Sequence, residues 1–258
     1  MTCLPSSPTP KRLGLVIDLD VCVGCHACVV NCKEWNTGGY GAALSDQHPY
    51  GADVSGAWLN RVHSYEVTPL DALMAAKSGG EVVAEAGDAR IVHFPKSCLH
   101  CEDAPCVTVC PTGASYKRAE DGIVLVDEDK CIGCGLCAWA CPYGAREMDL
   151  AAGVMKKCTL CIDRIYNETL EEEDRQPACV RTCPTNARHF GDFADPGSNV
   201  SIMVAERGGV DLMPEQGTRP TNKYLPPRAR QPLGHGALEN TDGATGFFGW
   251  LDRMLDKM

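Results

Sequence analysis

The chain has 258 residues and a formal net charge of −10, which suits one or two globular domains. An acidic chain lacks the basic face that a nucleic-acid binder needs, so no nucleic-acid partner is expected. No apolar run approaches the roughly 20 residues that cross a bilayer. The feature left to explain is the cysteine content, 17 residues in all.

Sixteen of these cysteines fall into four sets of four. Disulfide frameworks belong mostly to short secreted chains, so this clustering indicates metal sites instead. Cys3 lies outside the sets, and we expect it to be a free thiol. The first set is Cys22, Cys25, Cys28 and Cys32; the second is Cys98, Cys101, Cys106 and Cys110; the third is Cys131, Cys134, Cys137 and Cys141; the fourth is Cys158, Cys161, Cys179 and Cys183.

The first and third sets have the C-x2-C-x2-C-x3-C spacing of bacterial ferredoxins. Three thiolates on one tight loop can bind three irons of a cubane. The fourth thiolate, about one helical turn further on, ligates the other cluster of a pair. A zinc ribbon is the alternative for CxxC pairs, but a third cysteine so close would crowd a tetrahedral site. The spacing therefore predicts four [4Fe–4S] clusters.

Internal repeats indicate which sets belong together. The run LGLVIDLDVCVGCHACVVNC resembles GIVLVDEDKCIGCGLCAWAC, and PCVTVCPTGA resembles ACVRTCPTNA. Each two-cluster module needs one segment of each kind, so the adjacent second and third sets form one module and the first and fourth sets form the other. We predict an α+β fold of two bacterial-ferredoxin-like modules, with an inner module (93–150) inserted in an outer one (13–92 and 151–194).

Exchange of the fourth cysteine within each module gives the ligands of every cluster. On this assignment all irons are closed to substrate, and no catalytic residues are found in the chain. Closed clusters move single electrons. Cluster 1 takes Cys22, Cys25, Cys28 and Cys183; cluster 2 takes Cys158, Cys161, Cys179 and Cys32; cluster 3 takes Cys98, Cys101, Cys106 and Cys141; cluster 4 takes Cys131, Cys134, Cys137 and Cys110.

Several side chains beside these cysteines are candidates for a supporting role. His26 and His100 lie inside the loops, and we expect them to hydrogen-bond to sulfur or backbone rather than bind iron. Trp139 is expected to pack over a cluster. Neighbouring cations would raise the cluster potentials, or they are solvated surface charges; they are Lys33, Lys130, Lys156, Lys157 and Arg181.

Both ends of the chain differ in composition from the cysteine-rich part. Residues 1–12 are expected to form a flexible leader. Residues 195–258 are rich in proline and glycine and predict an extended tail that binds a partner. The tail should end in a short amphipathic helix whose charges cancel, which favours a protein partner over anionic lipid. The apolar face of that helix would consist of Phe247, Trp250, Leu251, Met254, Leu255 and Met258.

Four sets in this order, with an interrupted fourth set, resemble the iron–sulfur subunit of the DMSO reductase family of molybdenum enzymes, over residues 13–193. The resemblance implies a hetero-oligomer. In it, the chain lies between a large catalytic subunit that holds molybdopterin guanine dinucleotide and an integral membrane subunit that exchanges electrons with quinone. It also supports the crossed ligands, and it implies that cluster 4 lies nearest the membrane subunit and cluster 1 nearest the molybdenum subunit.

Two departures narrow the choice within the family. Nitrate reductase subunits carry tryptophan at the position of Cys134, and membrane-bound formate dehydrogenase subunits end in a transmembrane helix. What remains includes reductases for DMSO, polysulfide and tetrathionate, and sulfite dehydrogenase. The segment GADVSGAWLNRVHSYEV and the Pro-rich tail are most similar to sulfite dehydrogenase subunits, so electron transfer during sulfite oxidation is the leading hypothesis.

Two alternatives from other classes are a free-standing polyferredoxin and a zinc-stabilised interaction module without a redox role. The first twelve residues show neither a secretory nor a twin-arginine signal. We therefore expect a peripheral protein at the cytoplasmic face of the bacterial inner membrane, with periplasmic location by co-export on a partner left open.

Overall fold

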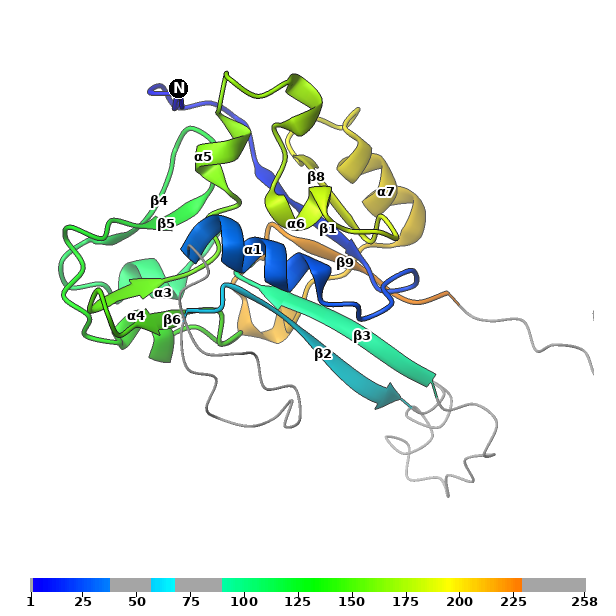
Figure 1. Ribbon diagram of the computed structural model, residues 1–258, viewed down its shortest axis with the longest axis horizontal. Helices are drawn as coiled ribbons and strands as arrows, with labels where there is room; N and C mark the ends of the chain where they lie inside the picture. Colours follow the sequence, from blue (N-terminus) through cyan, green and yellow to red (C-terminus); the bar gives the residue numbers. More distant parts are fainter. Residues whose placement is uncertain (1, 38–56, 68–89, 229–258) are drawn as a thin grey trace, which may run out of the picture. The chain divides into compact units, whose positions relative to one another are not determined.

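The computed structural model describes residues 2–37, 57–67 and 90–228 (Figure 1). Its helices are α1 (Ala27–Thr37), α3 (Pro105–Thr108), α4 (Leu136–Trp139), α5 (Ile162–Ile165), α6 (Ala178–Arg181) and α7 (Asn199–Arg207), with 3-10 turns η1 (Glu172–Asp174) and η2 (Pro214–Gln216). Its strands are β1 (Leu13–Asp18), β2 (Asn60–Val67), β3 (Arg90–Ser97), β4 (Ser115–Lys117), β5 (Val124–Val126), β6 (Glu147–Asp149), β7 (Val154–Lys156), β8 (Arg188–Asp192) and β9 (Lys223–Leu225). The mixture of short helices and strands is the predicted α+β class.

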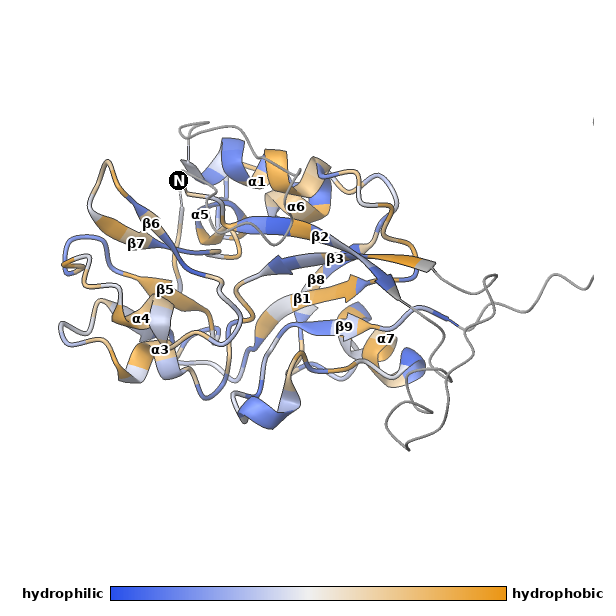
Figure 2. Cartoon of the chain, turned by 90° about the horizontal axis from the view of Figure 1, so that it is seen from below, coloured by the Kyte–Doolittle hydropathy of each residue, from blue (hydrophilic) through white to orange (hydrophobic). Residues whose placement is uncertain are grey.

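Strand β1 is the centre of a three-stranded sheet in the order β8-β1-β9. It runs antiparallel to β8 and parallel to β9. Most of β1 is hydrophobic (Figure 2), and its side chains alternate between the two faces of the sheet. Leu15 and Ile17 pack into the main core, whereas Val16 packs with Val200 and Leu225 on the other face. Burial on both faces explains why the strand is a continuous apolar run.

The helices that carry cluster cysteines are short because a Cys-Pro pair follows most of them. Helices α3, α4 and α6 end shortly before Pro111, Pro142 and Pro184. Proline has no N–H to donate and disfavours helical geometry in the residue before it. The first set lacks this proline, and α1 accordingly continues to Thr37.

The two sequence repeats have the same local structure. Strand β5 precedes the third cysteine set and pairs antiparallel with β4, which follows the second set. In the same way, β1 precedes the first set and pairs with β8, which follows the fourth. The helices repeat the pattern, since α4 contacts α3 and α1 contacts α6 (Figure 1). Two further hairpins, β2–β3 and β6–β7, lead into the second and fourth sets.

The segment after residue 195 differs from the extended tail that we predicted. Helix α7 is capped by Ser198, whose side chain accepts from the Ser201 amide, and β9 pairs with β1. Asn222 is fully buried; its Oδ1 accepts from the Leu15 amide at 2.8 Å and its Nδ2 donates to the Cys98 carbonyl at 3.0 Å. The free edge of β1 supplies hydrogen bonds that composition does not reveal. Residues 229–258, with the expected amphipathic helix, lie outside the described residues.

The leader also differs from the flexible segment that we expected. Thr2 forms a β-bridge with Asn167, and the Cys3 amide donates to the Tyr166 carbonyl at 3.0 Å. The Thr9 hydroxyl donates to the Glu120 carbonyl at 2.5 Å. These long-range backbone contacts hold the leader, and the Cys3 side chain is exposed. Among the described residues, no helix combines the length and apolar content that a bilayer span requires.

Replacing Tyr224 by alanine should destabilise the junction between β9 and the β2–β3 hairpin. The buried ring stacks on Phe94 with centroids 4.5 Å apart, and its hydroxyl donates to the Pro95 carbonyl at 3.1 Å. We expect a loss of about 3–5 kcal/mol for Tyr224→Ala and about 1 kcal/mol for Tyr224→Phe. The measurement is the apparent melting temperature of the anaerobically purified protein at a fixed scan rate. Leu150→Ala, at a side chain 84% exposed, is the control, and equal melting of Tyr224→Ala and the control would contradict the expectation.

Candidate iron–sulfur sites

The cysteine loops turn tightly because matching positions have left-handed backbone. In the first loop, Gly24 (φ 66°) and His26 (φ 60°) flank the second cysteine, and in the third loop Gly133 (φ 66°) and Gly135 (φ 77°) do the same. Alternation of right- and left-handed residues directs successive N–H groups to one concave side, which binds anions. His26 thus occupies a backbone position where the repeat uses glycine.

The second and fourth loops use the same backbone device with other residues. His100 (φ 48°), Leu160 (φ 54°) and Cys161 (φ 51°) are left-handed although none is glycine. A left-handed leucine costs about 1–2 kcal/mol, so surrounding interactions must hold it there. Sequence reasoning missed these positions because leucine carries no turn signal.

A second turn follows the cysteines that precede proline. Gly113 (φ 68°), Gly144 (φ 57°) and Asn186 (φ 51°) each stand three residues after such a cysteine. Asparagine tolerates this region better than most residues. The turn brings later amides back to the cysteine: the Ala187 amide lies 3.2 Å from the Cys183 sulfur. The recurring C-P-x-[G/N]-A pattern was the sequence signal for this turn.

Amide groups donate hydrogen bonds to many of the cysteine sulfurs. Such bonds stabilise a thiolate relative to a thiol. Asn36 joins two sulfurs, since its Nδ2 lies 3.6 Å from both Cys32 Sγ and Cys161 Sγ. The other backbone donors and sulfurs are Ser115 to Cys110 at 3.3 Å, Met155 to Cys131 at 3.4 Å, Ala178 to Cys161 at 3.4 Å and Leu160 to Cys158 at 3.5 Å.

The structure brings the first set close to the fourth. Burial raises the pKa of Cys32 well above its usual value, and the thiols of Cys158, Cys179 and Cys161 raise it further. Burial also raises the pKa of Cys22, with Cys28 and Cys183 contributing in the same direction. Cys32 and Cys183 therefore lie beside the loops of each other's sets.

The second and third sets also meet. Burial raises the pKa of Cys101 to about 12, and Cys98, Cys106 and Cys141 contribute in the same direction. A cavity between the two loops is lined by four cysteines, Cys110, Cys131, Cys134 and Cys137. Among all sixteen, Cys25 and Cys134 are exposed, Cys22, Cys110, Cys131, Cys141 and Cys183 are half-buried, and the other nine are buried.

The donor chemistry fits iron–sulfur clusters. Burial raises the pKa of Cys158 to about 12 as well, so this thiol and Cys101 would stay protonated at neutral pH without a cation. A bound metal removes such a proton outright. Thiolates are the usual ligands of iron–sulfur clusters, and a cubane spreads its four thiolates over four irons. In the described part of the chain, no three His, Cys, Asp or Glu side chains converge on a position for a single ion.

Two buried arginines, Arg146 and Arg188, escaped the sequence reasoning. Nη2 of Arg146 donates to Ser115 Oγ at 2.8 Å, and Nη2 of Arg188 donates to Asn60 Oδ1 at 2.7 Å. Burial opposes their charge, but the thiols of nearby cysteines raise the pKa of both guanidinium groups. The signal that could have found them is position, since each stands five residues after a cysteine that precedes proline.

The cations named from sequence divide into two groups. Lys33 and Lys157 are buried, and Lys33 Nζ lies 4.3 Å from the ring centroid of Trp58. The other three form ion pairs with carboxylates, which weakens their case as tuning groups: Lys130 with Asp127 at 2.6 Å, Lys156 with Glu128 at 3.1 Å and Arg181 with Asp174 at 2.5 Å.

His100 and Trp139 behave differently from one another. His100 is fully buried, and its Nδ1 accepts from the Val124 amide at 3.1 Å, as the expected backbone role requires. Burial, with the charges of Lys157 and Arg146, lowers the pKa of His100 well below its usual value, so the ring is neutral. Trp139 is 85% exposed, so the expectation that it packs over a cluster was wrong within this chain. Its neighbour on α4, Cys137, occupies the buried side.

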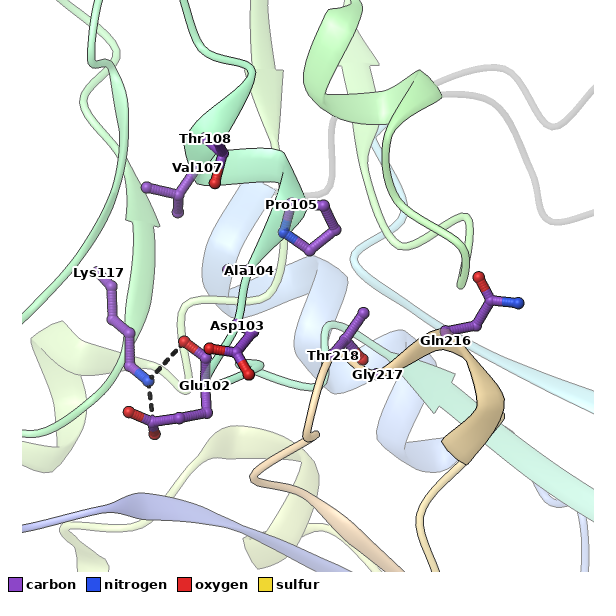
Figure 3. Close-up of a pocket in the computed structure, with 10 residues that line it drawn as sticks. All are labelled: Glu102, Asp103, Ala104, Pro105, Val107, Thr108, Lys117, Gln216, Gly217 and Thr218. Atoms are coloured by element: carbon purple, nitrogen blue, oxygen red, sulfur yellow. Dashed lines mark hydrogen bonds and ion pairs between the residues drawn. The ribbon is translucent and has the colours of Figure 1, made fainter.

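An open cavity beside the second cysteine loop contains the charged residues Glu102, Asp103 and Lys117 (Figure 3). Lys117 Nζ lies 2.7 Å from Glu102 Oε2. Asp103 pairs with Arg219 at 2.5 Å. Its charged groups are therefore engaged with each other or with neighbours, and the cavity offers no poised acid or base for catalysis.

Paired cysteine sets, anion-binding loops and amide donors to sulfur define a ferredoxin-type iron–sulfur protein. Comparison with family profiles agrees, since profiles described as a 4Fe-4S dicluster domain match residues 21–114 and 89–193. The B subunit of the sulfite dehydrogenase of Allochromatium vinosum is 58% identical over 217 residues, which covers 84% of this protein and 84% of the relative.

Two more distant relatives come from other complexes. The B subunit of the tetrathionate reductase of Salmonella typhimurium is 35% identical, covering 83% of this protein and 72% of the relative. The corresponding component of the polysulfide reductase of Wolinella succinogenes is 33% identical, covering 84% and 95%. This chain therefore belongs to the iron–sulfur subunits of DMSO reductase family complexes. It is an electron-transfer subunit with two dicluster domains, and its clustered cysteines suit four [4Fe–4S] clusters; its homologues are subunits of multi-subunit molybdoenzyme complexes.

Two glycines of the third loop should differ in their tolerance of alanine. Both are left-handed, so both substitutions cost about 1–2 kcal/mol. A Cβ on Gly133 would lie 2.4 Å from the Gly153 carbonyl oxygen, whereas a Cβ on Gly135 meets nothing within 4 Å. We expect Gly133→Ala to lose about four irons per molecule, one cubane, while Gly135→Ala keeps them. Iron and acid-labile sulfide analysis is the measurement, and equal iron contents in the two variants would count against this geometry.

Proposed function

We propose that this chain carries electrons through four [4Fe–4S] clusters from a molybdopterin-containing catalytic subunit to a quinone-reactive membrane subunit of a sulfite-oxidising complex. The identity of 58% with the sulfite dehydrogenase relative carries the substrate assignment. The identities with the tetrathionate and polysulfide reductase relatives are 35% and 33%. The same role in such a reductase is the second candidate, because the cluster machinery would be shared.

The cluster ligands follow the crossed assignment in this proposal. Its support is the proximity of Cys32 to the fourth set and of Cys183 to the first. Asn36 adds to it, because one amide group reaches sulfurs of Cys32 and Cys161, both ligands of cluster 2. The cavity lined by Cys110 and three cysteines of the third loop supports the ligands of cluster 4.

We also propose that the inner module, 93–150, is inserted in the outer one. The equivalent pairing of β4 with β5 and of β1 with β8 supports two copies of one ferredoxin-like unit. Contacts of α3 with α4 and of α1 with α6 support the same division. An insertion of this kind places the second module between the two halves of the first, so all four clusters fall within one continuous body.

The four clusters would form a chain in numerical order. Cys28 acts on the charge of Cys179, which relates clusters 1 and 2, and Cys98 acts on Cys158, which relates clusters 2 and 3. Beside the terminal clusters, apolar side chains are exposed. They suit burial against partner subunits: Val23 and Val30 lie beside the first cysteine set, and Ile132, Leu136 and Trp139 lie beside the third.

On the family resemblance, we assign the cluster 4 end to the membrane subunit and the cluster 1 end to the molybdenum subunit. The protein would then be peripheral, docked on its membrane subunit at the cytoplasmic face of the inner membrane. Bound clusters supply one-electron transfer. The polypeptide contributes fixed spacing, exclusion of water from the buried cysteines and amide donors to sulfur.

Sulfite should reduce the clusters of the intact complex. The experiment starts from a complex purified anaerobically from its own membranes and oxidised; sulfite is added and cluster reduction is followed by EPR. We expect signals of reduced clusters within the turnover time. Dithionite is the positive control for intact clusters. Reduction by dithionite but not by sulfite would refute the substrate, and the same sample would then be assayed with DMSO, polysulfide and tetrathionate as electron acceptors.

The crossed ligand assignment predicts which cysteine variants share a phenotype. Cys183→Ser should perturb the same EPR signal as Cys22→Ser, because both cysteines would bind cluster 1. Cys32→Ser should instead perturb the signal that Cys158→Ser perturbs. Cys3→Ser is the control and should leave every signal unchanged, since Cys3 is exposed and outside the sets. If Cys183→Ser and Cys158→Ser affected one common signal, the crossing would be wrong.

A further inference from the structure

Arg188 lies between the cysteines assigned to clusters 1 and 2. It is 2% exposed, and Nη2 donates to Asn60 Oδ1 at 2.7 Å. Nε and Nη1 are buried and have no hydrogen-bond partner among the described residues. The thiols that act on its charge are Cys179 and Cys32 of cluster 2 and Cys28 of cluster 1. The guanidinium therefore faces acidic groups of both clusters.

Arg146 stands in the equivalent place in the other module. It is 7% exposed, and Nη2 donates to Ser115 Oγ at 2.8 Å while Nη1 is buried without a hydrogen-bond partner in the described ranges. Cys106 and Cys98 of cluster 3 act on its charge, as does Cys137 of cluster 4. Arg146 thus relates clusters 3 and 4 as Arg188 relates clusters 1 and 2.

Lys157 occupies the remaining junction. It is 2% exposed, and its Nζ donates to the Cys158 carbonyl at 2.6 Å. Its charge acts on Cys158 of cluster 2 and on His100, which lies in the loop of cluster 3. Cys98 of cluster 3 is itself a neighbour of Cys158. A lysine is therefore present where the two modules meet.

These three cations need a counter-charge. A buried ion without a partner is strongly unfavourable, and within the described residues none of the three forms an ion pair with a carboxylate. An oxidised [4Fe–4S] core with four thiolates carries roughly −2. Two such groups repel each other in a low-dielectric interior, and a cation between them offsets that repulsion. The clusters on either side are thus the natural counter-charge.

We propose that Arg188, Lys157 and Arg146 each bridge two neighbouring clusters electrostatically, so that one buried charge raises the reduction potential of both clusters at its junction. The proposal rests on the crossed ligand assignment. It differs from general surface tuning because each cation acts on a defined pair. Adjacent cations share one cluster: Arg188 and Lys157 share cluster 2, Lys157 and Arg146 share cluster 3, and the two arginines share none.

The test is a mediator titration of the purified complex, with EPR reporting the potential of each cluster. Arg188→Gln, Lys157→Gln and Arg146→Gln should each weaken reduction of two clusters by tenfold or more, which is about 59 mV for a one-electron couple. Arg188→Lys should restore most of the loss because it keeps the charge. Arg181→Gln is the matched control. Arg181 stands two residues from a cluster cysteine, but it is 48% exposed and paired with Asp174, so its loss should change the reduction equilibrium less than twofold.

The pattern of overlap decides the outcome. Shifts of the pairs 1–2, 2–3 and 3–4 by the three variants support the proposal. A shift of one cluster only, an equal shift of all four, or a cluster shared by the two arginine variants overturns it. A purely structural role for the arginines would reduce iron content, and Arg188→Lys would not restore potentials that had never shifted.

A second variant covers the case in which Arg188→Gln does not retain iron. Asn60→Asp keeps the arginine but sets a negative charge beside it, since Asn60 Oδ1 accepts from Arg188. It should lower the potentials of the same two clusters, and unchanged potentials in an iron-replete Asn60→Asp protein overturn the proposal. The titration uses dithionite and mediators, so its result is independent of whether sulfite is the substrate.

Discussion

Bonds between cysteine thiolates and iron hold together elements that could not be stable alone. Helices α3, α4, α5 and α6 have four residues each, far below the length at which isolated helices form in water. The core shows the same dependence, because cysteines occupy many of its buried positions. Binding of the clusters and folding of the chain are therefore one process. The Cys-Pro pairs, the left-handed loop residues and the amide donors all position sulfur for that bond.

The charge that these bonds bring into the interior constrains everything around it. Thiolates and reducible clusters are negative, and the chain is acidic as well. The interior answers with amide dipoles and with buried cations that have no carboxylate partner in the described residues, Arg146, Arg188 and Lys157. Surface cations such as Lys130 pair with carboxylates instead, and solvent screens them. Position relative to the clusters, more than residue type, separates the two groups.

The segment 210–225 shows what a compact iron–sulfur protein must add to its ferredoxin-like units. Asn222 reaches β1 of one repeat and the Cys98 carbonyl that begins the second cysteine loop, so one buried amide joins both. Nearby, the Thr221 hydroxyl donates to the His100 carbonyl at 2.8 Å, and the hydroxyls of Tyr143 and Thr218 lie 2.5 Å apart. Fixed contacts of this kind keep the distances between clusters constant, which electron transfer requires.

The sequence by itself determined the cluster type, the number of clusters and the repeats, because cysteine spacing is a covalent property that reports directly on metal geometry. It also indicated β1 and β5 from their apolar runs. Only the tertiary structure decided which cations are buried between cluster sites, that residues 195–227 fold back onto β1, and that Trp139 faces outward. These depend on residues far apart in the chain, and a buried arginine reads like an exposed one until its neighbours are known.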